Sequence, residues 1–255
     1  MITDRKNTAP DNLLYGRQPI WEALQTGQNI DKILLQKGAG GDLVRQILHE
    51  AQQQEIPVQQ VPPETLDRIC RKNHQGMVAF AALVPYYKLE DILAKTYDDG
   101  KIPLFLICDG ITDVGNLGAI ARTAACTNVN GIIIAAKGSA PINADAIKTS
   151  AGALHHIHIC KVRFIDRAMQ FLQENGIQIV ASSLKTDKYI HEIDLTVPTA
   201  FVIGSEDKGV SPAFLKMADQ QIKIPIIGNF DSYNVSVATG MLLYETTRQR
   251  MLATI

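Results

Sequence analysis

Hydrophobic and polar positions alternate along the chain in two patterns, one typical of strands and one typical of helices. Short apolar runs that indicate buried strands occur at residues 32–35, 104–108, 131–136 and 200–204. Between such runs apolar residues recur with helical spacing, and over residues 42–54 they are Leu43, Val44, Ile47, Leu48 and Ala51. Strands that alternate with helices predict an α/β protein with a mostly parallel sheet covered on both faces.

The same pattern divides the chain into two α/β domains. Residues 1–12 are polar, and we expect them to be disordered. The first domain spans residues 13–85, with helices predicted near 19–26, 42–54 and 63–70 and strands at 32–35, 56–61 and 77–84. Residues 86–101, a polar stretch with a short helix and an Asp-Asp-Gly turn, are predicted to be a linker.

The second domain is predicted to span residues 102–255 and to continue the alternation more strongly. We expect strands at 104–108, 131–136, 156–160, 177–182, 200–204 and 221–226. Helices are expected at 117–127, 143–151, 164–175, 212–218 and 235–251.

Composition and charge restrict the class of protein. The chain has 255 residues, of which 46% are hydrophobic and 20% charged, which excludes a disordered, collagen-like or coiled-coil protein. Its 25 basic and 26 acidic residues leave a net charge of −1, so no overall positive field favours nucleic acid or an anionic membrane. No apolar run reaches the ~20 residues of a membrane span, and the first residues lack a signal peptide's apolar core. We therefore expect a cytoplasmic protein with no membrane partner.

Cysteine and histidine give no sign of a metal or of disulfides. Cys70, Cys108, Cys126 and Cys160 are widely spaced and form no C-x-x-C pair, so we expect all four to be reduced packing residues. The cluster His155, His156 and His158 has no acidic or cysteine residue close in sequence. We therefore expect no metal site there.

Three polar loops follow predicted strands, at the ends where parallel sheets bind ligands. The first, residues 109–118, leads into a helix with Asn116 at its expected N-cap and Arg122 among apolar residues. Such an arginine needs an ion-pair partner or a wet cleft. The second loop, from Gly204 to Gly209, holds Glu206 between two glycines, and a solvated turn is the alternative interpretation.

The third segment runs from Ile224 through a polar loop into the last predicted helix. Asn234 and Ser236 fall at the start of that helix, where backbone N–H groups lack partners. Helix capping is the structural alternative to a functional role for both residues. A dinucleotide site is a weak alternative for the three loops together, because their glycines do not form G-x-G-x-x-G.

Taken together the three segments resemble the three motifs of the SpoU, or TrmH-like, family of RNA 2′-O-ribose methyltransferases. The motifs are N-x-G-x-x-x-R at 116–122, G-x-E-x-x-G at 204–209 and I-P followed by N-V-S-x-A at 234–238. The resemblance begins near Leu13, since Tyr15-Gly16-Arg17 and His74-Gln75-Gly76 are similar to the family's small substrate-binding domain. Within the family, the pattern looks closest to bacterial enzymes that methylate a guanosine ribose in large-subunit ribosomal RNA.

The resemblance implies a fold, a cofactor and partners. It implies a parallel-sheet catalytic domain of the SPOUT type with a trefoil knot, after a small α/β domain similar to a ribosomal protein fold. It also implies a homodimer that uses S-adenosylmethionine to methylate a ribose 2′-hydroxyl in structured RNA, and we expect that RNA to be ribosomal. The alternatives are the same reaction on transfer RNA and a non-catalytic RNA-binding ribosome-assembly factor. A nucleotide-dependent enzyme acting on small molecules is a third, but it would leave the first domain and the third motif unexplained.

The resemblance also assigns roles to residues by motif position. The expected catalytic residues are Asn116, Arg122, Glu206, Asn234 and Ser236, and the expected cofactor contacts are Gly204, Ile224 and Tyr233. The expected RNA contacts in the first domain are Arg17, Lys72 and His74. Val114 departs from the proline common in the first motif, and Tyr233 from the leucine common in the third. For Arg122, stabilisation of an alkoxide is physically easier than proton removal, because a guanidinium keeps its charge.

Overall fold

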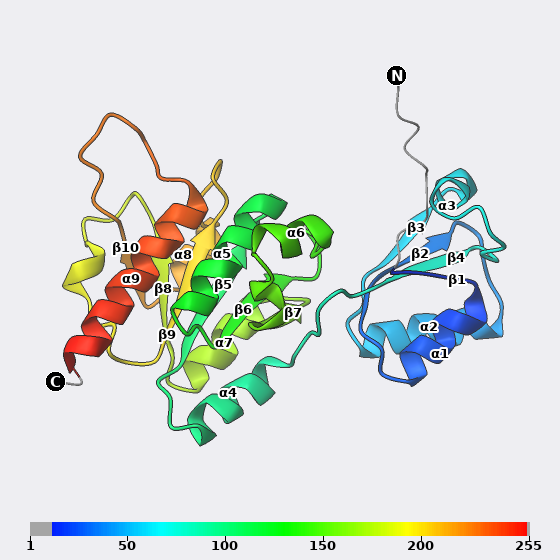
Figure 1. Ribbon diagram of the computed structural model, residues 1–255, viewed down its shortest axis with the longest axis horizontal. Coiled ribbons are helices and arrows are strands. Elements are labelled where there is room, and N and C mark those ends of the chain that lie inside the picture. The colour runs from blue at the N-terminus through cyan, green and yellow to red at the C-terminus, as the bar shows by residue number, and fades with distance from the viewer. Residues whose placement is uncertain (1–11, 254–255) are drawn as a thin grey trace. The chain divides into compact units, whose positions relative to one another are not determined.

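A computed structural model describes residues 12–253 and divides into two compact units, with the boundary between residues 83 and 84 (Figure 1). We predicted disorder for residues 1–12, and of these residues the structure describes only Asn12. That residue is ordered, because its Nδ2 donates a hydrogen bond to the Ala81 carbonyl at 2.7 Å.

The first unit is a four-stranded sheet in the order β1-β4-β2-β3. The strands are β1 (Leu13–Tyr15), β2 (Ile30–Gln36), β3 (Val58–Val61) and β4 (Met77–Ala81). The helices are α1 (Arg17–Gln25), α2 (Asp42–Gln53) and α3 (Pro63–Ile69). Strand β4 runs antiparallel to β1 and β2, whereas β2 and β3 are parallel. Strand β1 has no counterpart among the predicted elements.

Alternation along the strands determines which helix lies on which face of this sheet. Ile33 and Leu35 of β2 point into a core shared with α1 and α2, while Leu34 points to the other face, against α3. Successive strand residues face opposite sides, so the buried run 33–35 requires cover on both faces.

The second unit is a six-stranded sheet in the order β10-β8-β9-β5-β6-β7, with every pair parallel. Its strands are β5 (Leu104–Asp109), β6 (Gly131–Ala135), β7 (His158–Val162), β8 (Gln178–Ser182), β9 (Thr199–Gly204) and β10 (Gln220–Ile222). The α-helices are α4 (Leu89–Asp98), α5 (Val114–Cys126), α6 (Ala144–Thr149), α7 (Ile165–Glu174), α8 (Pro212–Met217) and α9 (Val235–Ala253). Two short 3₁₀ helices, η1 (Ala153–His155) and η2 (Ile190–Glu192), complete the unit's elements.

Two apolar cores lie on opposite faces of the larger sheet. Leu106 and Phe201 pack with α5, α6 and α9 on one face, and Phe105 and Val202 pack with α4, α7 and α8 on the other. The sequence pattern therefore predicts the parallel sheet and its double cover correctly.

The polar stretch 86–101 is not only a linker. It contains α4, whose Leu89, Ile92 and Leu93 are buried in the core of the second unit. The backbone N–H of Tyr87 also donates to the Ile159 carbonyl on β7, at 2.9 Å. The polar residues that suggested a linker are the exposed face of an amphipathic helix.

Several boundaries differ from the predicted ones. Strand β10 ends at Ile222, so residues 224–226 belong to the following loop. Strand β7 begins at His158, and His156 precedes it at the end of η1. Helix α5 begins at Val114, three residues before the predicted start at 117.

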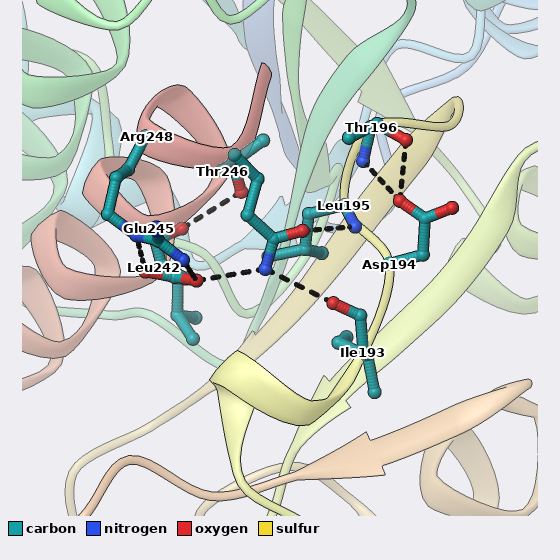
Figure 2. Close-up of polar contacts among 9 residues, drawn as sticks. Ile193, Asp194, Leu195, Thr196, Leu242, Glu245, Thr246 and Arg248 are labelled. Atoms are coloured by element: carbon teal, nitrogen blue, oxygen red, sulfur yellow. Dashed lines mark hydrogen bonds and ion pairs between the residues drawn. The ribbon is translucent and has the colours of Figure 1, made fainter. Parts of the chain in front are cut away.

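The last helix, α9, is held to the segment that precedes β9. Gln249 accepts a hydrogen bond from the Leu195 N–H at 2.9 Å and donates one to the Ile193 carbonyl at 3.1 Å. Figure 2 shows Ile193 and Leu195 beside the turn of α9 that carries Glu245 and Thr246. No helix of the described residues is both long and apolar enough to cross a membrane.

Candidate active site

Strand order brings the loops of the first two motifs together. Strands β5 and β9 are neighbours, and their last residues, Asp109 and Gly204, are paired in register. The loop after β5 and the loop after β9 therefore leave the sheet side by side. The Asp109 carboxylate accepts a hydrogen bond from the Ser211 N–H at 2.7 Å, which closes the second loop.

Gly204 allows this loop to fold back on itself. A Cβ atom at this position would lie 1.9 Å from the carbonyl carbon of Gly209 and 2.1 Å from the nitrogen of Val210. Both atoms are backbone, so they cannot move aside as a flexible side chain would. The first glycine of G-x-E-x-x-G is thus required by packing within the loop, and it holds Glu206 at the edge of the sheet.

A cluster of three side chains joins all three motifs at this edge. The Asn116 Nδ2 donates to Glu206 Oε1 at 3.2 Å, and the Asn234 Nδ2 donates to Asn116 Oδ1 at 3.0 Å. The Asn234 Nδ2 also donates to Glu206 Oε1, as does the Val235 N–H at 3.4 Å. All the hydrogen bonds that Glu206 accepts from described residues thus end on Oε1, and none ends on Oε2.

The other end of Asn234 caps helix α9. Its Oδ1 accepts from the Ser236 hydroxyl at 2.6 Å, from the Ser236 N–H at 3.0 Å and from the Val237 N–H at 3.4 Å. Capping and participation in the cluster are therefore not alternatives for this residue, because its amide does both. Ser236 keeps oxygen lone pairs that these bonds do not use.

Arg122 does not join this cluster. It is exposed on α5 and makes no hydrogen bond or ion pair with any described residue. Six residues separate it from Asn116, which is about 240° around a helix axis, so the two side chains leave α5 on different faces. Arg122 thus has no ion-pair partner among the described residues, and its exposed side chain is solvated instead.

The start of α5 differs from the predicted one in its cap. The N-cap is Asp113, not Asn116, because the Asp113 carboxylate accepts from the Asn116 N–H at 2.7 Å. This bond leaves the Asn116 side chain free for the cluster. Asp113 precedes an apolar helix in the position that acidic caps favour, so the sequence contained the signal. By contrast, no local sequence pattern indicated that the Asp109 carboxylate would close the second loop by accepting from Ser211. Val114, the first helical residue, packs partly buried against the core.

The three expected cofactor residues lie along the same edge of the sheet. Gly204 ends β9, Ile224 follows β10 and packs against the core, and Tyr233 directly precedes Asn234. The Tyr233 hydroxyl donates to the Pro225 carbonyl at 3.0 Å and so ties the two ends of this loop together. Among the described contacts, no backbone N–H of residues 224–233 donates a hydrogen bond. These donors suit a ligand recognised through backbone groups.

The expected RNA contacts of the first unit fall into two kinds. Arg17 and His74 are already engaged: the Arg17 Nε donates to the Gln75 carbonyl at 3.1 Å, and the His74 Nε2 lies 2.9 Å from Asp67 Oδ1. Lys72 is exposed, with its ammonium 5.3 Å from the centre of the Tyr15 ring.

Three of the four cysteines are packing residues, as expected. Cys70, Cys108 and Cys160 are buried, and burial raises the thiol pKa of Cys108 and Cys160 to about 12. The expectation is wrong for Cys126, which is exposed near the end of α5. Across residues 12–253, no group of three or more histidine, cysteine or acidic residues is arranged to hold a metal ion.

Two family models match this chain. The one described as the SpoU rRNA methylase family covers residues 103–244, and the one described as RNA 2′-O ribose methyltransferase substrate binding covers residues 13–87. A TrmH family tRNA/rRNA methyltransferase of Staphylococcus aureus (strain MSSA476) is 34% identical over 94% of this chain and 97% of the relative. One of Staphylococcus haemolyticus (strain JCSC1435) is 32% identical over 94% and 96%.

Solved structures agree with these matches. The TrmH/SpoU tRNA modifying enzyme of A. aeolicus is 34% identical, with a TM-score of 0.56 over 65% of this chain and 86% of that chain. The AdoMet-bound rRNA methyltransferase of Sinorhizobium meliloti is 25% identical, with a TM-score of 0.58 over 92% and 86%. The SpoU methyltransferase AviRb of Streptomyces viridochromogenes, 24% identical with a TM-score of 0.60 over 94% and 90%, has the same fold.

Proposed function

The chain belongs to the SpoU family of RNA 2′-O-ribose methyltransferases, and we propose that the cluster around Glu206 is where it methylates a ribose 2′-hydroxyl. The observation that carries the proposal is the meeting of Asn116, Glu206 and Asn234, which lie on three separate segments. Folding alone does not require three polar side chains from separate segments to meet at an exposed edge of the sheet.

The methyl donor is S-adenosylmethionine, which supplies an electrophilic methyl carbon on a sulfonium sulfur. The residues present fit this group. The loop 224–233, closed by the bond from Tyr233 to Pro225, offers unpaired backbone N–H donors, and Gly204 ends β9 at the same edge of the sheet. We assign Gly204, Ile224 and Tyr233 to cofactor binding, with the contacts made by backbone groups.

Positioning is the main task of the cluster. Displacement at the methyl carbon requires the ribose oxygen to lie in line behind it, so fixed geometry contributes much of the rate. Asn234 is held at both ends of its amide, and Asn116 is held by Asn234 and Glu206. We assign Asn116, Asn234 and Ser236 to orienting the ribose and the loop.

Glu206 is assigned the proton. The three hydrogen bonds to Oε1 hold the carboxylate in place, while Oε2 remains available to accept the hydrogen of a ribose 2′-hydroxyl. Removal of this proton by a positioned base turns a poor nucleophile into a good one.

Arg122 is assigned electrostatic stabilisation of the alkoxide and of a neighbouring phosphate. Its guanidinium is exposed and has no described partner, so it is free to meet an anion that arrives with the RNA. Because it lies on a different face of α5 from Asn116, it acts from outside the cluster and not as a member of it.

The RNA is ribosomal in this proposal. The relatives are named as tRNA/rRNA methyltransferases, and the motif pattern looks closest to enzymes of large-subunit ribosomal RNA. Mapping ribose methylation in ribosomal and transfer RNA from a strain that lacks this protein tests the assignment. Loss of a methyl group from transfer RNA alone would overturn it.

The working form is a homodimer built on α9. One face of this helix is buried through Val235, Thr239, Leu242, Leu243 and Thr246. The opposite face exposes an apolar stripe, which consists of Val237, Met241, Tyr244, Met251 and Leu252. A helix that is apolar on both faces calls for cover on both, and a second copy would bring two such stripes together.

Substitution of Arg122 and Glu206 tests the proposed chemistry. The measurement is transfer of a labelled methyl group from S-adenosylmethionine to ribosomal RNA. As a control, calorimetry compares the binding of S-adenosylmethionine with that of NAD, the rival ligand. Arg122→Ala should abolish transfer while the cofactor still binds. Glu206→Gln keeps an acceptor for the three donors but no base, so transfer should fall by about 10²–10⁴. Near-normal turnover of either variant, or binding of NAD instead, would refute the assignment.

A further inference from the structure

The first unit has a cavity at one edge of its sheet, a shallow pocket that is broadly open to solvent. Strands β1 and β2 end at this edge and β4 begins there, because β4 runs antiparallel to both. The loops that follow β1 and β2 and the segment between α3 and β4 surround a space of about 600 Å³. This volume lies within the roughly 300–1,000 Å³ typical of small-molecule sites.

Arg17 and His74 hold the wall of this cavity in place. The Arg17 guanidinium donates to two carbonyls on different loops, that of Gln75 at 3.1 Å and that of Gly40 at 3.0 Å. The His74 Nδ1 accepts from the Gly76 N–H at 3.1 Å, which leaves the proton on Nε2, beside Asp67 Oδ1 at 2.9 Å. Both ring nitrogens of His74, and the Nε and Nη1 of Arg17, are thus engaged with the protein itself.

Other groups of the wall are left for a ligand. Arg71 is exposed and makes no hydrogen bond or ion pair with the described residues, and the one described contact of the Lys72 ammonium is with the Tyr15 ring. The side-chain amides of Gln36 and Asn73 likewise have no described hydrogen bond. Asp67 is the lone carboxylate lining the cavity, and it is paired with His74. The cavity therefore offers positive charge together with amide donors and acceptors.

We propose that this cavity binds one unpaired nucleotide of the substrate RNA together with its adjoining phosphates. The proposal rests on the proposed function, which makes RNA the substrate. Amides such as those of Gln36 and Asn73 pair with the Watson–Crick edges of bases, which are accessible where bases are unpaired. Arg71 and Lys72 contact phosphate oxygens. A duplex keeps the Watson–Crick edges of its bases paired, so it leaves these amides fewer partners.

The assignment separates contact from positioning. Arg71, Lys72, Gln36 and Asn73 contact the nucleotide, whereas Arg17 and His74 keep the loops in register as positioning residues. Arg17→Ala should therefore increase hydrogen exchange in loops 36–41 and 72–76 as well as weaken RNA binding. Arg71→Ala should weaken RNA binding and leave exchange in those loops unchanged.

The test measures RNA binding by the full-length protein with S-adenosylmethionine present. The probes are a fluorescein-labelled hairpin of ribosomal RNA with an unpaired loop and a blunt RNA duplex of the same length. Binding is measured by fluorescence anisotropy at a series of salt concentrations. Arg71→Ala should weaken hairpin binding on the order of tenfold. It should also lower the slope of log affinity against log salt concentration by about 1. Asn73→Ala should weaken it without changing the slope, because an amide releases no counterion.

Arg68→Ala is the matched control. Arg68 is an exposed arginine three residues from Arg71 and without a described partner, but it does not line the cavity. It should leave hairpin affinity within about twofold of the wild type. Equal losses from both arginine variants, or a duplex that competes as well as the hairpin, would overturn the proposal.

The two proposals fail separately. If the wild-type protein transfers no methyl group to RNA, the proposed function fails whatever the binding data show. If it transfers methyl groups but Arg71→Ala binds the hairpin as the wild type does, only the nucleotide cavity fails.

Discussion

At the scale of single residues, Asn234 connects the active-site cluster to the structure of the last helix. Its Nδ2 donates to Glu206 and Asn116, while its Oδ1 caps α9 through Ser236 and Val237. An amide is the side chain that can donate and accept at once in this way. A serine would cap the helix but would not reach both partners, and an aspartate would bring a second negative charge beside Glu206.

We predict that Asn234→Ala lowers the free energy of unfolding by about 1–2 kcal/mol through loss of the cap. Methyl transfer should fall more steeply than this, because Glu206 and Asn116 lose their common partner. Urea unfolding and a labelled-methyl assay measure the two effects. Asn229→Ala, in the same loop and exposed, is the control, and an equal loss of transfer in that variant would contradict the assignment.

Cysteine reactivity gives a second prediction at this scale. The thiols of Cys108 and Cys160 are buried with a pKa raised to about 12, so they stay protonated at pH 8, and Cys70 is also buried. Cys126 is exposed. Brief treatment of the folded protein with iodoacetamide should therefore modify Cys126 first, as read by peptide mass spectrometry. After unfolding, all four cysteines should react, and early modification of Cys108 would show that the packing is wrong.

At the scale of elements, α9 is hydrogen-bonded to the segments that precede strands β5 and β9 of the second unit. Arg250 donates from its guanidinium to four carbonyls, those of Ile102, Pro103, Leu195 and Val197. Burial lowers the pKa of this arginine, but a guanidinium stays charged near neutral pH. The bonds join the helix to the residues that precede β5 and β9, the two strands that carry the first two motifs.

We predict that Arg250→Ala lowers the free energy of unfolding by about 2–4 kcal/mol, because several charge-assisted bonds are lost together. Arg248→Ala is the matched control, since Arg248 forms an ion pair with Glu245 within the same helix and is well exposed. It should cost at most about 1 kcal/mol. Urea unfolding, followed by circular dichroism, distinguishes the two variants. Equal losses of unfolding free energy would show that the four Arg250 bonds contribute no more than a surface ion pair.

The same helix provides the test of the homodimer. Tyr244→Lys places a charge within the exposed stripe, where Tyr244 is 68% exposed in the single chain. We predict that it shifts the mass measured by light scattering from two chains to one. Leu184→Lys, at a 61% exposed leucine outside α9, should leave the mass unchanged. A wild-type protein with the mass of one chain would refute the dimer directly.

At the scale of the whole molecule, the two units divide the work between them. Each has its own sheet and its own apolar cores, and the boundary falls between residues 83 and 84. The proposed chemistry uses residues of the second unit alone, and the proposed nucleotide cavity uses residues of the first unit alone. A division of this kind lets one unit bind RNA while the other transfers the methyl group.

We predict that a chain of residues 84–255 folds, binds S-adenosylmethionine with the affinity of the full chain and remains a dimer. Its affinity for ribosomal RNA should fall by at least about tenfold, because the phosphate contacts of the first unit are absent. Calorimetry, light scattering and filter binding measure the three properties. Undiminished RNA affinity would show that the second unit binds RNA by itself.

The sequence by itself determined the class of fold, the motifs and the types of most elements. Strand and helix periodicities are local, so the runs at 104–108 and 131–136 and the helix at 42–54 could be read directly. The three motifs carried the family because their residue types and spacing are preserved in the chain. The balanced net charge determined little, since it describes long-range attraction and not where side chains gather.

The tertiary structure decided which of these residues meet. Asn116 lies 90 residues from Glu206 and 118 from Asn234, and their contacts depend on strand order, which local periodicity does not encode. The same cause explains the engagement of Arg17 and His74 with backbone carbonyls and Asp67. The misplaced N-cap is different, because the Asp113 cap is a local bond to Asn116 that the sequence could have indicated. Hydrogen bonds are formed between neighbours in space, and only the packing of two sheets with their helices determines those neighbours.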